Sequence, residues 1–313
     1  MASTSRRRRV RPEASAARGA WVIAGVIAFL LVDVVLVVFA ISLNRSSGAA
    51  PEPETLPTVG VEASSTPTPT APPVVPAPRF LVATSPTSAW RSSPGECGGA
   101  DAVLESTTDG GATWAPHSTG DDAVHEVLAL APIDQTQVSV VGKAGDGCTT
   151  TSVFSSFTSG DFWQSYPETL SSYSYVDPAD RATLIVTGSA QATPCSPALQ
   201  AVATTDRVLA VCAGQVAEFI PSAQTWSTTD VPGVLAVTPT DTGSTVAVSG
   251  AEGCAGIAIE ALPSPLGGAP ATVLGCVADE TSPLAATLSQ SGSTLWLWSG
   301  GTTRISQDGG VTW

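Results

Sequence analysis

Two stretches of eight residues, far apart in the chain, share one pattern and decide the fold. Residues 107–114 read TTDGGATW and residues 306–313 read SQDGGVTW, so both follow Ser/Thr-x-Asp-Gly-Gly-x-Thr-Trp. The aspartate can accept hydrogen bonds from the amides of a tight turn, the glycines can adopt positive φ, and the tryptophan can pack on a neighbouring strand. The pattern predicts a braced hairpin turn, with structural roles for Thr107, Asp109, Gly111, Trp114, Ser306, Asp308, Gly310 and Trp313.

Degenerate copies of this pattern lie between the two intact ones. Residues 156–163 read SFTSGDFW and keep Ser156, Gly160 and Trp163, with Thr158 where the aspartate belongs. Residues 222–226 (SAQTW) keep only the final Thr-Trp. At about 40–45 residues per repeat, residues 79–313 correspond to five or six repeats, and we predict six.

The sequence around these turns is typical of an all-β protein. Short runs of Val, Ala, Leu, Ile and Thr are interrupted by Gly, Pro, Asp or Ser, without a helical stripe. Repeats of this length predict a β-propeller of about six blades over residues 79–313. Because the sequence ends on the tryptophan of the last copy, the final blade is expected to take a strand from residues 80–83 to close the ring.

The Ser/Thr-x-Asp-Gly-Gly-x-Thr-Trp pattern resembles the Asp box, the hairpin signature of the BNR (sialidase-type) repeat. The resemblance rests on the two intact copies and implies a propeller whose boxes are structural. It also implies two functions. Asp-box propellers of sorting receptors and of a photosystem II assembly factor family imply a non-catalytic binding or assembly module with a protein or glycan partner of unknown identity. Sialidases imply a glycoside hydrolase that acts on surface or environmental glycans.

The residues give the enzyme alternative little support. Sialidases resemble one another in an arginine triad and in a Phe/Tyr-Arg-Ile-Pro segment near the domain start, but residues 77–81 read APRFL. The chain contains no GxSxG, no phosphate-binding Gly-Lys-Ser/Thr loop and no HExxH. We therefore predict no catalytic residue, no cofactor and no metal site. His117 and His125 are expected at the surface.

Three tryptophans leave a choice between a core and a binding role. Trp90, Trp296 and Trp298 are interpreted as packing between blades, and an aromatic binding rim is the alternative.

The six cysteines indicate three disulfides in an oxidising compartment. Fifteen pairings exist, and the predicted hairpins favour one. A hairpin that turns near residues 263–268 would join Cys254 to Cys276, and one that turns at 204–206 would join Cys195 to Cys212. Cys97 and Cys148 remain, each ahead of a turn copy in consecutive blades.

Residues 20–43, AWVIAGVIAFLLVDVVLVVFAISL, predict a transmembrane helix. A helix of 24 residues is about 36 Å long, enough to cross a hydrocarbon core of about 30 Å. Residues 1–19 hold six arginines and only Arg45 follows closely, so this basic tail is expected in the cytoplasm and the rest outside the plasma membrane. A cleaved signal peptide is the alternative, but its apolar region would be shorter.

Asp33 lies near the middle of this predicted span. A carboxylate there is costly, so it indicates a partner helix or a polar pocket, and a tolerated protonated side chain is an equal alternative.

The segment over residues 44–78 holds nine prolines, many of them alternating with threonine. Such a composition favours an extended, disordered linker. At about 3.1 Å per residue it could hold a domain roughly 100 Å from the membrane.

The downstream part of the chain is acidic. Residues 46–313 contain 25 Asp and Glu against six Lys and Arg, a net charge of −19. This balance excludes ordinary nucleic-acid binding, which needs clustered cations. The whole chain has one Lys, one Asn and twelve Arg, a skew that indicates a GC-rich genome and suggests an actinobacterium.

Overall fold

The computed structural model describes residues 78–120, 123–278 and 286–313. The predicted basic tail, transmembrane span with Asp33, and linker lie outside these residues, apart from Pro78. Within the described ranges no helix is long and apolar enough to cross a bilayer.

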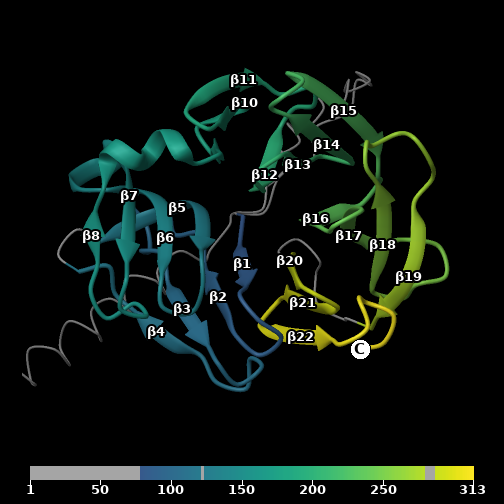
Figure 1. Ribbon diagram of the computed structural model, residues 1–313, viewed down its shortest axis with the longest axis horizontal. Coiled ribbons are helices and arrows are strands. Elements are labelled where there is room, and N and C mark those ends of the chain that lie inside the picture. The colour runs from purple at the N-terminus through teal and green to yellow at the C-terminus, as the bar shows by residue number, and fades with distance from the viewer. Residues whose placement is uncertain (1–77, 121–122, 279–285) are drawn as a thin grey trace, which may run out of the picture. The chain divides into compact units, whose positions relative to one another are not determined.

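The described residues form six antiparallel sheets around a central axis, so the fold is the predicted all-β propeller of six blades (Figure 1). Each blade's strands follow one another along the chain. Blade 1 contains β1 (Phe80–Ala83), β2 (Ala89–Ser92), β3 (Leu104–Thr107) and β4 (Ala115–His117). Blade 2 contains β5 (Val124–Pro132), β6 (Val138–Ala144), β7 (Thr150–Ser156) and β8 (Gln164–Ser165), and blade 3 contains β9 (Tyr175–Asp177), β10 (Asp180–Val186) and β11 (Ser189–Ala192).

The second half of the ring repeats this arrangement. Blade 4 contains β12 (Ala198–Ala203), β13 (Val208–Cys212), β14 (Gln215–Ile220) and β15 (Thr225–Asp230). Blade 5 contains β16 (Val234–Pro239), β17 (Gly243–Ser249), β18 (Ile257–Pro263) and β19 (Thr272–Val277), and blade 6 contains β20 (Ala286–Ser291), β21 (Thr294–Ser299) and β22 (Thr302–Ser306). Two short 3-10 helices, η1 (Asp146–Cys148) and η2 (Pro167–Ser172), lie in loops.

The core lies between neighbouring blades, and β21 shows why. Its sequence TLWLWS is buried throughout because both faces of the sheet are covered. Leu295 and Leu297 pack with blade 5, whereas Trp296 and Trp298 pack with blade 1. Trp90 and Trp296 are 0% exposed and Trp298 is 7% exposed, so these tryptophans belong to the core and not to an aromatic rim.

The ring closes without the shared strand that we expected. Residues 80–83 pair with β2 as the first strand of blade 1, and the sheet of blade 6 has three strands. Side chains join the two blades instead. The Arg91 guanidinium lies 3.9 Å from the centre of the Trp114 ring and 4.8 Å from that of Trp298, and the Ala83 amide donates to Ser289 Oγ at 2.8 Å.

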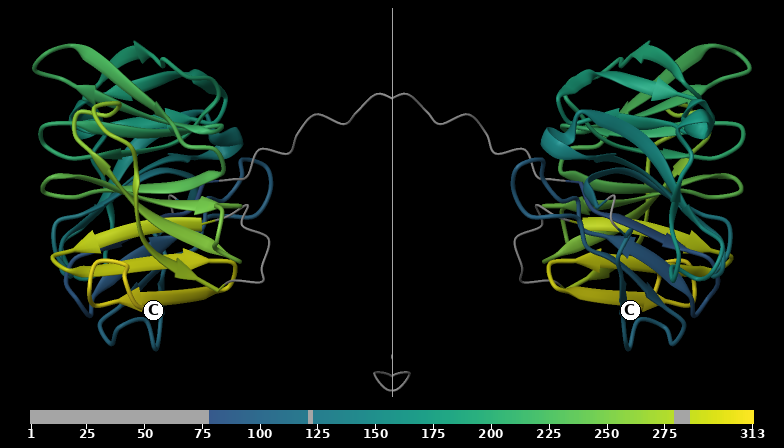
Figure 2. Two further views of the ribbon diagram at one scale, coloured as in Figure 1. Left: turned by 90° about the vertical axis from the view of Figure 1, so that its right-hand side faces the viewer. Right: turned by 90° about the vertical axis from the view of Figure 1, so that its left-hand side faces the viewer.

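The order of the strands defines two faces of the propeller, seen from the sides in Figure 2. We call the face with the loops between second and third strands the upper face; it includes residues 93–103, 145–149 and 250–256. The lower face carries the turns between first and second strands and between third and fourth strands, including residues 133–137 and 157–163. Blade 3 runs in the opposite sense, because the β9–β10 turn follows Asp177, which meets Lys143 near the upper face, and the β10–β11 turn contacts Ser174 on the lower side. Because β1 begins at the upper face, the chain enters the propeller there.

Candidate functional site

The two intact copies of the turn motif have the same hydrogen bonds. In residues 107–114, Asp109 accepts from the Thr113 amide at 2.9 Å and from the Thr113 hydroxyl at 2.6 Å, and the Thr107 hydroxyl accepts from the Gly111 amide at 3.1 Å. In residues 306–313, Asp308 and Thr312 form the same pair of bonds, at 2.9 Å and 2.7 Å. The Thr113 and Thr107 bonds lower the pKa of Asp109 to about 2. The aspartates therefore brace turns and are not poised for proton transfer.

The glycine at the fifth position of each copy lies against the preceding blade. Gly160 has a φ of 89°, and a Cβ there would come within 2.3 Å of the His117 ring of blade 1. Gly310 has a φ of 102°, and a Cβ would lie 2.8 Å from Ile259 of blade 5. Gly111 faces Trp296 of blade 6 with a looser contact of 3.5 Å. The motif thus joins blades as well as bracing its own hairpin.

The degenerate copy over residues 156–163 keeps the turn with different side chains. The Ser156 hydroxyl accepts from the Gly160 amide at 2.9 Å, and the Thr158 hydroxyl accepts from the Phe162 amide at 3.0 Å. The Trp163 indole donates to the Gly160 carbonyl at 2.9 Å, as Trp313 does to Gly310. Residues 222–226 form the equivalent turn of blade 4, between β14 and β15.

All three disulfides lie at or near the upper face, and their pairs are those favoured from the sequence. Cys97–Cys148 joins the β2–β3 loop of blade 1 to the β6–β7 loop of blade 2. Cys195–Cys212 holds the entry into β12 against the end of β13, and Cys254–Cys276 holds the β17–β18 loop against β19. The disulfides therefore brace one face of the ring.

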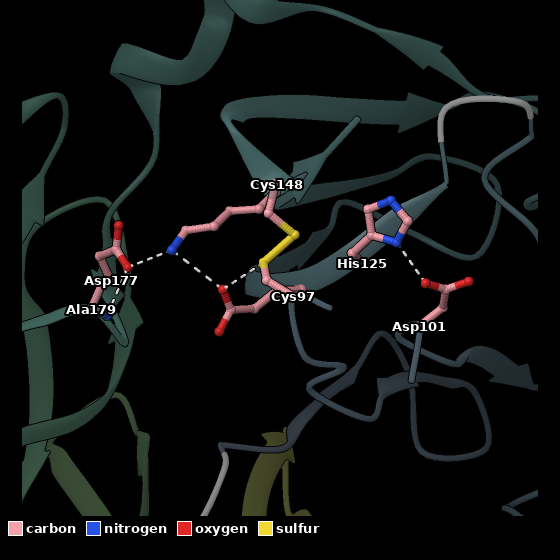
Figure 3. Close-up of a disulfide and its surroundings, with 8 residues drawn as sticks. Cys97, Asp101, His125, Cys148, Asp177 and Ala179 are labelled. Carbon is pink, nitrogen blue, oxygen red and sulfur yellow. Dashed lines mark hydrogen bonds and ion pairs between the residues drawn. A yellow bond between two sulfur atoms is a disulfide. The ribbon is translucent and has the colours of Figure 1, made fainter. Parts of the chain in front are cut away.

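A charged cluster lies beside the Cys97–Cys148 disulfide (Figure 3). Lys143 of β6 lies 3.3 Å from the Glu126 carboxylate of β5 and 2.7 Å from that of Asp177 in blade 3. Burial opposes the charge of Lys143, but the bond to Asp177 and the charge of Glu126 outweigh it and raise the pKa of Lys143. The cluster, with one cation shared by two carboxylates, is a structural link between blades 2 and 3.

The two histidines, expected at the surface, are partly exposed, and each also contacts a neighbouring side chain. The His117 ring lies 4.8 Å from that of Trp90, and its Nε2 is 2.8 Å from Ser106 Oγ. Burial lowers the pKa of His117, with a smaller opposing effect from the Gly160 backbone and Asp161. His125 Nδ1 lies 2.6 Å from Asp101. Each histidine thus has a structural partner.

A cavity of about 460 Å³ lies on the axis near the lower face. It is enclosed by the innermost strands of five blades and by the segment from Ser172 to Ser174. Aliphatic, hydroxyl and amide side chains line it, with the Tyr173 ring on one side and Gln200 and Gln290 among the amides. None of the described residues that line it is charged. The volume suits a small ligand, but this lining has no acid–base pair.

No arginine of the described residues lines this cavity, and only Arg79 and Arg91, which both stack on the Trp298 ring, lie close to each other. Arg79 and Arg91 lie between blades 6 and 1, Arg181 contacts the start of β12, and Arg207 pairs with Glu218 between blades 4 and 5. Arg304 lies on β22. A sialidase-like arginine triad around the axis is not formed by these side chains.

The solvent-exposed charges of the described residues are all negative. Each of the six Lys and Arg is buried or half-buried, whereas twelve acidic residues are exposed. These are Glu96, Asp101, Asp109, Asp134, Asp161, Glu168, Asp180, Asp206, Asp230, Asp241, Glu252 and Asp308. Such a surface repels anionic polymers and attracts cationic groups. Composition alone indicated that the surface charge is negative. Only the structure shows that the Lys and Arg of the described residues are not exposed.

No protein-family model and no curated protein matches this chain. Solved structures with a similar fold include YCF48 bound to D1 peptide, at 15% identity and a TM-score of 0.40, covering 77% of this chain and 81% of that one. They also include a GH74 enzyme of Niastella koreensis, at 13% identity and a TM-score of 0.41, with 75% of this chain and 45% of that one covered.

A third is PorZ, a surface component of the type-IX secretion system of Porphyromonas gingivalis, at 11% identity and a TM-score of 0.36. The match covers 72% of this chain and 36% of PorZ. The chain thus spans less than half of PorZ and of the GH74 enzyme. These likenesses concern the fold alone and assign neither a ligand nor an activity.

Proposed function

We propose that this protein is a single-pass plasma-membrane protein whose propeller is a non-catalytic binding or assembly module outside the cell. Residues 20–43 provide the anchor, and residues 44–78 provide an extended spacer. The repeated turns, with their shared hydrogen bonds, support a relationship to Asp-box propellers.

The observation that carries the proposal is the chemistry of the central cavity. Glycosidases commonly need two carboxyl groups about 5–9.5 Å apart beside the scissile bond, and a sialidase-like enzyme also needs clustered arginines. The described cavity lining has neither, because the arginines are used to pack blades and the acidic side chains lie elsewhere. This lining offers side chains that can bind a ligand and no pair of groups that would react with it.

The test is cross-linking and co-purification of the full chain from its native membrane. A version that ends at Pro78 is the control, since it keeps the anchor and linker without the propeller. A partner recovered with the full chain and lost with the control supports the proposal. A partner retained by the control would assign binding to the N-terminal segments, where Asp33 lies. Hydrolysis of a glycan panel by the full chain would overturn the non-catalytic assignment.

A further inference from the structure

The lower face of blade 2 exposes large apolar side chains that lie close together. Phe162 is 76% exposed, Ile133 69% and Phe157 53%. The Phe157 ring meets that of Tyr166 edge-on, with centroids 6.1 Å apart. Thr136, in the turn of Ile133, accepts from the Ser159 amide at 2.9 Å, so the two turns are joined. We call Ile133, Phe157, Phe162 and Tyr166 the blade 2 patch.

The turn does not need its phenylalanines. Phe157 takes the place of Thr108 and Gln307 in the intact copies, and Phe162 that of Thr113 and Thr312. All four of those polar residues are exposed. The intact turns fold with polar residues at both positions. The turn therefore does not require the phenylalanines, which leave 53% and 76% of their surface exposed.

The hydrogen-bond partners have changed together. In the intact copies a threonine hydroxyl donates to the aspartate carboxylate, at 2.6 Å for Thr113 and Asp109. In blade 2 both groups are replaced, by Phe162 and Thr158, and only the bond from the backbone amide remains, at 3.0 Å. Replacing both partners leaves no buried polar group unpaired. The turn is thereby kept while an aromatic ring is presented to solvent.

The rim of the patch is acidic. Asp134 follows Ile133, Asp161 precedes Phe162, and Glu168 lies in η2 just after Tyr166; all three are exposed. Since each described Lys and Arg is at least half-buried, no exposed cation in these ranges offsets them. A partner that covers the patch must bring apolar side chains for the rings and cations for the rim.

From this combination we propose that the blade 2 patch docks a segment of another protein that presents apolar side chains flanked by Lys or Arg. The proposal rests on the proposed binding function and names its surface. The patch is on the lower face, opposite to the upper face at which β1 begins. An anionic bilayer is the less favoured occupant, because its surface potential repels the acidic rim.

The first experiment measures binding of synthetic peptides to the full chain in detergent by fluorescence anisotropy. The probe is a 12-residue peptide of alternating Leu/Trp and Lys/Arg, compared with a version carrying Glu in place of the cations. We expect the cationic peptide to bind at least tenfold more tightly than the anionic one. Phe157→Thr with Phe162→Thr, which installs threonines like those of the intact copies, should weaken it about tenfold or more. Val311→Thr, which removes an exposed valine from the copy over residues 306–313, is the matched control and should change binding less than twofold.

A second variant keeps the phenylalanines and removes charge. Asp161→Asn with Glu168→Gln should weaken the cationic peptide several-fold at low salt and have less effect at high salt. Unchanged binding by both double variants, or equal loss in Val311→Thr, would overturn the proposal. Binding of anionic-lipid vesicles that is lost with the phenylalanines, without peptide binding, would also overturn it in favour of a membrane contact.

Photo-cross-linking in cells separates this proposal from the broader function. p-Benzoylphenylalanine replaces Phe162, Thr113 as the matched position in blade 1, or Tyr173 in the central cavity. A protein cross-linked from position 162 and not from 113, through a segment that contains apolar residues and cations, supports the patch. Cross-links from position 173 alone would refute the patch and retain a binding propeller. No cross-link from any of the three positions, together with glycan hydrolysis, would refute both.

Discussion

The buried pair Arg207–Glu218 makes a sharp prediction about how the blades are held together. Glu218 of β14 is 0% exposed and Arg207 is 7% exposed. Arg207 Nη1 donates to Glu218 Oε1 at 3.1 Å, and Nη2 donates to the Gly243 carbonyl at 2.6 Å and to the Thr240 carbonyl. Thr240 and Gly243 belong to blade 5, so this one guanidinium ties blade 4 to its neighbour.

Replacement of Arg207 by methionine removes the cation while filling most of its volume. Glu218 keeps hydrogen bonds from Ser264 Oγ at 2.8 Å and from the Leu266 amide at 3.2 Å, but its charge has no partner, and two carbonyls lose their donor. Breaking a buried ion pair from one side costs about 3–5 kcal/mol. For a domain of this size that lowers the melting temperature by roughly 6–20 °C.

Thermal unfolding of the full chain, followed by circular dichroism, measures this loss. The double variant Arg207→Met with Glu218→Leu should be more stable than Arg207→Met alone, because it buries no unpaired charge. A loss below about 1 kcal/mol for Arg207→Met, or a double variant as unstable as the sum of the singles, would refute the reasoning.

Three further predictions concern the turns and a disulfide. Gly310→Ala should destabilise the propeller more than Gly309→Ala in thermal unfolding, because both have positive φ but only Gly310 lies against blade 5, and equal effects would contradict this. The depressed pKa of Asp109, about 2, means that its stabilisation is fully present above the ordinary carboxyl pKa near 4 and is lost as pH falls through about 2. Protection of residues 107–114, measured relative to the intrinsic exchange rate at each pH, should therefore fall between about pH 4 and 2, and in Asp109→Asn this fall should be absent. Replacing Cys97 and Cys148 together by serine opens a loop of 51 residues and should cost about 4 kcal/mol in denaturant unfolding, and a loss under about 1 kcal/mol would show that the blades hold this face without it.

Local patterns predicted the architecture well because propeller repeats are local. The length of the repeat, about 40–45 residues over residues 79–313, predicted six blades. The predicted hairpins placed two of the cysteine pairs, since each hairpin is closed by its own sequence, and the third pair followed as the remaining one. The prediction of how the ring closes was wrong because closure is not a local property. Whether residues 80–83 pair with β2 or with blade 6 depends on contacts such as Arg91 with Trp298, which join the two ends of the domain.

The phenylalanines of the blade 2 patch lie in a turn whose sequence departs from the repeat motif. Thr158 in place of the aspartate is visible in the sequence and was interpreted only as degeneration of the repeat. Phe162 in place of threonine was the available signal, because that position is exposed wherever the turn forms. Its meaning needed the structure, in which Phe157 of the same turn meets Tyr166, the turn of Ile133 is joined to this turn, and exposed acidic residues flank them.

Hydrogen–deuterium exchange of the full chain, with and without the protein that co-purifies with it, tests the central claim most directly. A propeller that binds through blade 2 should show slower exchange in residues 133–137 and 156–166 in the complex, with the equivalent residues 306–313 of blade 6 unchanged. Protection confined to residues 200–205 and 287–290, which line the central cavity, would contradict this account and place binding on the axis.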